Sequence, residues 1–138
     1  MTGTQPGRLA ELTTAESIAL LGGVSFGRIV FAQRALLAVR PVNHLIDGGA
    51  VVIRTHLGAA ALSAVGMVVA YEADAIDPDD HTGWCVVVTG MARLVREPEV
   101  VARYERLLRP WVSGQMDHVI RIRPEIVTGY RLVDGTAK

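Results

Sequence analysis

Residues 26–55, FGRIVFAQRALLAVRPVNHLIDGGAVVIRT, decide the fold, because they contain four short runs of aliphatic and β-branched residues. The polar pair Gln33-Arg34 interrupts the series early, and Asp47-Gly48-Gly49 interrupts it late. An Asp-Gly step is a strong hairpin signal, since its positive φ matches the twist of the flanking strands. Four strands in one meander predict a barrel or a sandwich. We expect these strands at Phe26–Phe31, Leu36–Val42, Asn43–Ile46 and Ala50–Thr55.

Outward from this meander the chain alternates further strands with short helices. Thr13-Thr14-Ala15-Glu16 has the pattern of a capping box, and Gly22-Gly23 would end that helix in a left-handed conformation. Gly90 indicates a bulge or a close backbone approach inside a long strand. The expected total is six to eight strands with three short helices. The other predicted strands are Met67–Ala73, Trp84–Val95, His118–Ile122 and Ile126–Val133, and the other helices are Gly58–Val65 and Glu97–Leu108.

Length and composition favour one globular domain. The chain has 138 residues, of which 50% are hydrophobic and 20% are charged, so it can bury a substantial core. Residues 1–10 have little hydrophobic periodicity, and we expect a flexible N-terminal segment there. Residues 11–138 would form the single domain.

Charge and hydropathy exclude several classes of partner. Fourteen basic residues balance fourteen acidic ones, which leaves no electrostatic footprint for nucleic acid. The most apolar stretch, Ala59–Tyr71, is shorter than the roughly 20 residues that a membrane span requires. Cys85 is the only cysteine, and Met1–Arg8 lacks the apolar run of a signal peptide. We therefore expect a cytoplasmic protein that binds neither membranes nor nucleic acid.

No motif in the chain predicts a metal centre or a catalytic side chain. The four histidines lack metal-ligand spacing, so structural or surface roles are the better interpretation. Cys85 lies in an apolar run and is interpreted as packing, and Ser25 has no nucleophile-elbow setting. Glu72 with Asp77, Asp79 and Asp80 forms an acidic group that loop solvation explains. Catalytic residues stay unknown at this stage.

Several segments, in their order and spacing, resemble the flavin-binding proteins of the pyridoxamine 5'-phosphate oxidase-like family that are common in actinobacteria. The resemblance runs from about Glu11 to Val133, and no single motif carries it alone. The matching segments are Gly27-Arg28-Ile29, Arg40-Pro41-Val42-Asn43-His44, Ile53-Arg54-Thr55 with Gly58, Val69–Asp74, Thr82–Gly90, Pro110-Trp111 and Val127–Tyr130.

The resemblance implies a mainly β split barrel that works as a homodimer with two FMN molecules at the subunit interface. Because a flavin itself transfers hydride and electrons, no catalytic side chain need be visible. The resemblance also implies a role for individual residues. Arg40, Pro41, Val42 and Asn43 would border the flavin, and Arg54 and Thr55 would approach its ring or phosphate. Gly58 would open the phosphate loop, and Trp84 together with Trp111 of the partner would form apolar walls.

The chain departs from the family pattern at the phosphate loop. Relatives commonly have the sequence Gly-Thr-Lys after the Arg-Thr pair, and the lysine binds the phosphate. This chain has Gly58-Ala59-Ala60 instead. Backbone N–H groups at a helix N-terminus can still bind a phosphate. Losing the charged donor is expected to cost about 1.5–3 kcal/mol of binding free energy.

Alternatives remain open for residues and function alike. Arg40 and Arg54 could be solvated surface arginines, Trp84 could be core or interface packing, and Trp111 could anchor a helix end. The first functional prediction is an FMN-dependent oxidoreductase acting on a small-molecule substrate. The alternatives are a reductase that uses the deazaflavin F420, and a non-catalytic dimeric binding protein that has lost FMN. The apolar strands favour a homodimer in every case.

Overall fold

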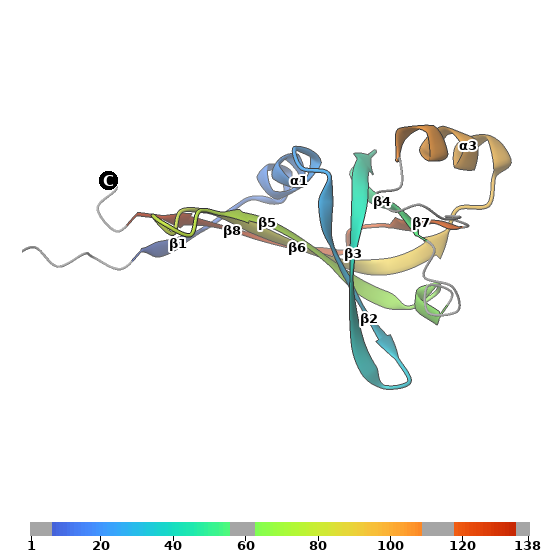
Figure 1. The fold of residues 1–138 in the computed structure, drawn as a ribbon, viewed down its shortest axis with the longest axis horizontal. Coiled ribbons are helices and arrows are strands. Elements are labelled where there is room, and N and C mark those ends of the chain that lie inside the picture. The colour runs from blue at the N-terminus through green and yellow to red at the C-terminus, as the bar shows by residue number, and fades with distance from the viewer. Residues whose placement is uncertain (1–6, 56–62, 109–117, 135–138) are drawn as a thin grey trace, which may run out of the picture.

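The computed structural model describes residues 7–55, 63–108 and 118–134, and it consists mainly of β-strands (Figure 1). Two helices lie within these residues, α1 (Thr14–Gly22) and α3 (Pro98–Leu107). In the described part of the chain, neither helix is long and apolar enough to cross a membrane. The strands are β1 (Arg8–Glu11), β2 (Phe26–Gln33), β3 (Leu36–Asp47), β4 (Ala50–Thr55), β5 (Val68–Ile76), β6 (Gly83–Leu94), β7 (His118–Ile122) and β8 (Ile126–Val133).

Six of the strands close into a barrel in the order β2-β3-β4-β7-β6-β5, and β5 pairs with β2 to complete the ring. The first part of β6 pairs with β8, and its last residues pair with β7. Strands β8 and β1 therefore extend the sheet beyond the barrel (Figure 1). All the pairings are antiparallel. This architecture confirms the predicted split barrel, and the eight strands among the described residues fall within the predicted range of six to eight.

Strand β3 forms the corner between the two halves of the barrel. It pairs with β2 from Leu36 to Asn43 and with β4 from His44 to Asp47. The two strands predicted at Leu36–Val42 and Asn43–Ile46 are therefore one continuous strand. The sequence contains no turn residues at Asn43, because the strand continues there and only its partner strand changes.

Two tight turns set the register of the meander. Gly48 and Gly49 have φ values of 59° and 80° between the paired residues Asp47 and Ala50, which confirms the predicted hairpin. The earlier turn consists of Arg34 and Ala35, both with positive φ, and lies one residue later than the predicted polar pair.

Helix α1 begins with the predicted capping box. The Glu16 amide donates to the Thr13 hydroxyl at 3.1 Å, and the Thr13 amide donates to the Glu16 carboxylate at 2.9 Å. The helix ends at Gly22 as expected, but the mechanism was wrong, because Gly23 has φ −83° and is right-handed. Its amide donates to the carbonyls of Leu20 and Leu21 instead.

The N-terminal strand begins inside the segment that was expected to be flexible. Arg8–Glu11 pairs with Tyr130–Val133 of β8, so the sheet begins at Arg8. This segment lacks hydrophobic periodicity. Its place in the sheet comes from backbone hydrogen bonds to the otherwise free edge of β8. The helix predicted at Gly58–Val65 lies mostly outside the described residues.

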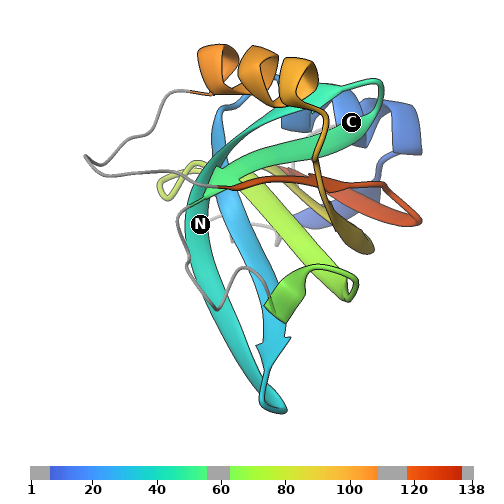
Figure 2. The ribbon, with the colours of Figure 1, turned by 90° about the vertical axis from the view of Figure 1, so that its right-hand side faces the viewer.

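The core fills the barrel and extends under α1. Alternate residues of β6 point inward, among them Trp84, Val86 and Val88, which gives the strict burial alternation of a half-buried strand. A second, smaller cluster lies outside the barrel, where α3 covers β4 and β7 (Figure 2). It consists of Val52, Val119, Tyr104 and Leu108, with partly buried neighbours around them.

Candidate functional site

The sheet brings two of the predicted cofactor-binding segments together. Because His44 pairs with Ile53 in antiparallel register, the next residues outward are Asn43 on β3 and Arg54 on β4. Residues 40–43 thus precede the point where β3 meets β4, and Arg54 and Thr55 end β4. The sequence alone could not place these segments side by side without the register of the second hairpin.

Residues 40–43 differ in exposure along β3. Arg40 is exposed and donates from Nη1 to the carbonyl of Val39 at 3.0 Å. Its side chain lines a groove of about 570 Å³ beside the tip of the β2–β3 hairpin. Pro41 is exposed, Val42 is buried, and Asn43 is half-buried. The exposed Arg40 therefore remains accessible to an anionic ligand.

Arg54 is held against the end of α3. Its Nη1 donates to the carbonyls of Glu105 and Leu108, both at 3.2 Å, and its Nη2 lies 3.5 Å from the Glu105 carboxylate. The side chain is only 17% exposed. Its Nε is buried and has no hydrogen-bond partner among the described residues. Arg54 is therefore not a solvated surface arginine, and it carries one unsatisfied donor.

The remaining predicted site residues divide into two groups. Gly58, Ala59, Ala60 and Trp111 lie outside the described residues, and Thr55 is described only as the strand partner of His118. Trp84 is 8% exposed and belongs to the main core cluster. It lies on β6, which pairs with neither β3 nor β4. The structure thus places Trp84 in the core and does not bring it beside Arg40 or Arg54.

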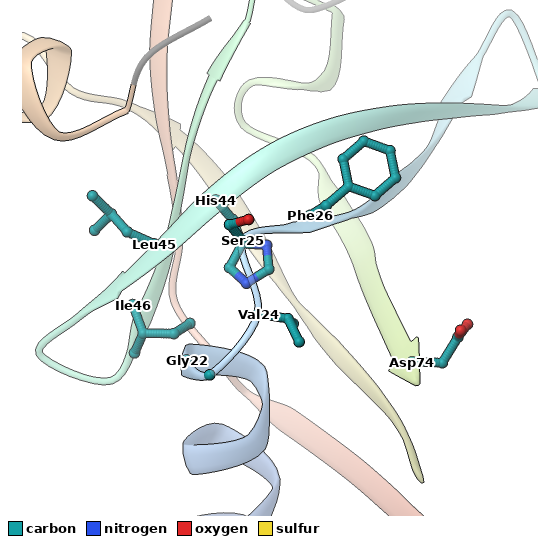
Figure 3. Close-up of a pocket in the computed structure, with 9 residues that line it drawn as sticks. Gly22, Val24, Ser25, Phe26, His44, Leu45, Ile46 and Asp74 are labelled. Carbon is teal, nitrogen blue, oxygen red and sulfur yellow. The ribbon is translucent and has the colours of Figure 1, made fainter. Parts of the chain in front are cut away.

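A cavity of about 680 Å³ lies where α1 leads into β2, next to β3 (Figure 3). His44 faces it from β3 and is 3% exposed. The His44 Nε2 lies 2.8 Å from the carbonyl of Leu21, and its Nδ1 lies 2.5 Å from the hydroxyl of Tyr71. The same hydroxyl lies 3.3 Å from the carbonyl of Val42. These contacts connect the end of α1, β3 and β5.

The hydrogen bonds determine the state of His44. A carbonyl can only accept, so Nε2 carries the proton that is donated to Leu21. In the neutral ring Nδ1 then accepts the single hydroxyl proton of Tyr71, and the more distant carbonyl of Val42 does not receive that proton. Burial lowers the pKa of His44 below its usual range and raises the pKa of Tyr71. Both groups are therefore neutral near pH 7. This arrangement supports the structural interpretation of His44.

The outer face of β5 carries an acidic pair, and the sequence-based grouping of one of its members, Glu72, with the acidic loop residues is wrong. Glu72 is bound to Arg28 at 3.0 Å, and Asp74 lies 3.6 Å from the same guanidinium. Burial, together with Asp74, raises the pKa of Glu72 to about 7. Glu72 thus belongs to a cross-strand ion pair and not to the loop group. Asp77 and Asp80 do stabilise that loop, since their carboxylates accept from the amides of Asp79 and Thr82.

Cys85 pairs with Asp74 across β5 and β6. Burial raises the pKa of its thiol, and the neighbouring carboxylates raise it further. A raised pKa disfavours the reactive thiolate, which agrees with the packing interpretation. Among the described residues, no cluster of His, Cys, Asp or Glu could hold a metal ion.

Comparison with known proteins identifies the class of protein that this barrel represents. The family model described as pyridoxamine 5'-phosphate oxidase matches residues 13–131. The chain therefore belongs to the pyridoxamine 5'-phosphate oxidase family, as the sequence motifs predicted.

Individual relatives agree with this assignment. The chain is 54% identical over 131 residues to Rv0080, an uncharacterised protein of Mycobacterium tuberculosis, and the match covers 91% of this chain and 86% of the relative. The solved structure of an FAD-binding protein from Mycobacterium smegmatis has a TM-score of 0.77 and 34% identity, covering 91% of this chain and all of the other. A Corynebacterium glutamicum structure assigned to the pyridoxamine 5'-phosphate oxidases has a TM-score of 0.79 and 31% identity, covering 99% and 100%.

Proposed function

We propose that this protein binds a flavin nucleotide beside β3 and the end of β4, and that it is a flavin-dependent oxidoreductase acting on a small molecule. One observation supports this most directly: the Arg54 Nε is buried without a partner among the described residues. An unsatisfied buried donor costs free energy unless a ligand accepts from it. An anionic cofactor would satisfy it.

The donors that this proposal assigns to the cofactor come from two arginines. Arg54 offers its Nε, and the exposed Arg40 offers a guanidinium that bonds only to a neighbouring carbonyl among the described residues. Residues 40–43 and 54–55 would hold the flavin nucleotide, with Gly58, Ala59 and Ala60 at its phosphate and Trp111 from the partner subunit. A bound flavin supplies hydride and electron transfer, while the protein supplies orientation and a dry pocket.

FMN is the cofactor we propose first, with F420 as the alternative. The relative from M. smegmatis is named as an FAD-binding protein, which supports a flavin but not a particular one. FMN and FAD share the isoalloxazine ring, so the same strand residues would serve either. A deazaflavin has the same tricyclic shape, and binding assays with each cofactor separate these cases.

We also propose a homodimer, because apolar side chains gather on exposed strands. Leu36 is 73% exposed and Leu37 is 80% exposed at the tip of the β2–β3 hairpin, and Val39 and Val68 are about half exposed. Exposed apolar patches commonly mark an interface between subunits. Light scattering at micromolar concentration should return twice the chain mass. A monomer mass would remove the intersubunit site for the flavin.

Arg54→Ala should weaken FMN binding by roughly tenfold or more, since it removes a charged donor. It should also destabilise the protein by about 1–2 kcal/mol, because Arg54 bonds to carbonyls at the end of α3. Fluorescence titration and thermal melts measure the two effects separately.

Glu105→Gln is the matched control, because it removes the carboxylate partner of Arg54 and leaves the guanidinium in place. This variant should keep most of its FMN affinity. Unchanged affinity in Arg54→Ala, together with a lowered melting temperature, would mean that Arg54 only supports α3.

Ala60→Lys should raise FMN affinity by roughly tenfold, because relatives keep a phosphate-binding lysine at the matching position. The gain should shrink at high salt, since part of it comes from an exposed charge. Titration of flavin fluorescence in the wild type and the variant measures it, with Ala59→Thr expected to give a smaller gain. No gain in a folded Ala60→Lys variant would argue against a phosphorylated flavin or against this register.

A further inference from the structure

The end of the barrel opposite the proposed flavin site contains a groove rich in arginine. The groove has a volume of about 770 Å³ and is lined from β6, β7, the β3–β4 turn and the start of α1. Arg93, Arg121 and Arg123 line it, and Glu125 is its only acidic lining residue among the described residues. β4 starts here at Ala50 and ends at Thr55, so the groove lies about 15 Å from the proposed flavin site.

The register of the sheet places two of these arginines directly opposite each other. Arg93 of β6 pairs with Arg121 of β7, and both side chains are exposed on the outer face, where their strand neighbours Ala92 and Ile122 are buried. Like charges opposite each other on antiparallel strands destabilise a sheet. An anion that contacts both arginines would offset this repulsion and stabilise the sheet.

The nearby carboxylates leave this positive charge largely uncompensated. Among the described residues, Arg93, Arg121 and Arg123 form no ion pair within 4.0 Å. Asp47 is the last residue of β3, next to Gly48 of the groove, and its pKa is lowered by the hydrogen bond from Tyr104 and by the charges of Arg103 and Arg121. Its carboxylate, however, is bound by Arg103 and by the hydroxyl of Tyr104.

The rest of the lining leaves room for a ligand at the arginines. Gly48 and Gly49 have no side chains, and a Cβ added to Gly49 would meet nothing within 4 Å. Thr14, the first residue of α1, also lines the groove, which places the positive end of the helix dipole there. The volume lies in the range of sites that bind nucleotide-sized molecules.

We propose that this groove is a second ligand site, which binds a phosphate or diphosphate group of a small molecule. Guanidinium groups recognise phosphate oxygens through paired hydrogen bonds, and three of them here can contact several oxygens at once. None of the described residues that line the groove is aromatic, so these residues offer no stacking surface for the bases of a nucleic-acid strand. The source of the group is either a free phosphate or a nucleotide.

Calorimetric titration of the full chain at low ionic strength tests this site with three probes: inorganic phosphate, pyrophosphate and adenosine diphosphate. Pyrophosphate should bind the wild type, and Arg93→Gln and Arg121→Gln should each weaken it at least tenfold. Arg8→Gln makes the same change of charge on β1, away from the groove, and should leave the affinity unchanged. Tighter binding of adenosine diphosphate than of pyrophosphate would identify a nucleotide, and equal binding would identify a free diphosphate.

A second measurement uses stability. Without any anion, Arg121→Gln should raise the melting temperature, because it relieves the like-charge pair, and added pyrophosphate should stabilise only the wild type and Arg8→Gln. FMN affinity should be the same in all these variants, which keeps this site separate from the proposed flavin site. Failure of all three probes to bind the folded wild type, or an equal loss of affinity in Arg8→Gln, would overturn the proposal.

Discussion

Replacing Gly90 by alanine should lower the free energy of unfolding by about 2–4 kcal/mol, since the added methyl group has no space. A Cβ at this position would collide with the backbone carbonyl of Arg123, just after β7. That carbonyl cannot move freely, because the chain pairs again two residues later, where the Glu125 amide donates to Thr89 at 2.9 Å. Urea denaturation of wild type and variant measures the difference.

Gly66→Ala provides the control for this effect. Gly66 has φ +83°, so alanine there is strained, but a Cβ would meet nothing within 4 Å. Its cost should be about 1 kcal/mol, from backbone strain alone. A loss in Gly90→Ala no larger than that in Gly66→Ala would mean that the sheet adjusts to the methyl group. The sequence predicted a bulge or a close approach at Gly90, and the structure confirms the close approach.

His44→Leu should lower the free energy of unfolding by about 2–4 kcal/mol at pH 7.5. The leucine keeps the apolar volume but removes both polar contacts of the imidazole, with Leu21 and with Tyr71. Tyr71→Phe should cost less, about 1–2 kcal/mol, because it leaves the bond to Leu21 intact. The double variant should lose less than the sum of the two, since both singles break the same contact.

The pH dependence of stability offers an independent check on His44. Its folded pKa lies below its unfolded value, so protons favour the unfolded state. The contribution of His44 is therefore fully present above its unfolded pKa of about 6.5 and is lost as the pH falls toward the folded pKa. The stability of His44→Leu should not show this decrease as the pH falls. Equal slopes for wild type and variant below pH 6.5 would contradict a buried neutral histidine.

The pKa shift of Glu72 changes stability with pH in the opposite direction, so its contribution must be separated from that of His44. Its folded pKa of about 7 is above the usual value, so its contribution is lost as the pH rises toward 7. Because the wild type and His44→Leu both keep Glu72, its effect cancels when their slopes of stability against pH are subtracted.

The strand pattern was predictable because it depends on local composition and on turn residues. The Asp-Gly-Gly hairpin, the capping box at Thr13 and the strands β7 and β8 needed no tertiary information. The continuity of β3 was not predictable, since its change of partner is a property of the closed barrel. For the same reason, sequence reasoning did not pair Arg93 with Arg121, which lie 28 residues apart in the chain.

Individual site residues were harder to interpret than the fold. Arg54 ends a predicted strand, and nothing in its neighbourhood of the sequence indicates that α3 returns to it about 50 residues later. His44 ends one of the segments that carry the family resemblance, yet its partners come from α1 and β5. A lone histidine in an apolar strand was a usable signal of burial, but the partners depend on the topology.

The central claim is that this barrel binds a flavin, and the absorption spectrum of the purified protein tests it most directly. The spectrum is recorded before and after addition of FMN, with F420 and FAD as parallel additions, and unbound cofactor is removed by gel filtration. We expect a flavin to stay with the protein at one per subunit, with a shifted visible band, and Arg54→Ala to retain much less. A colourless folded protein after every addition would contradict the account.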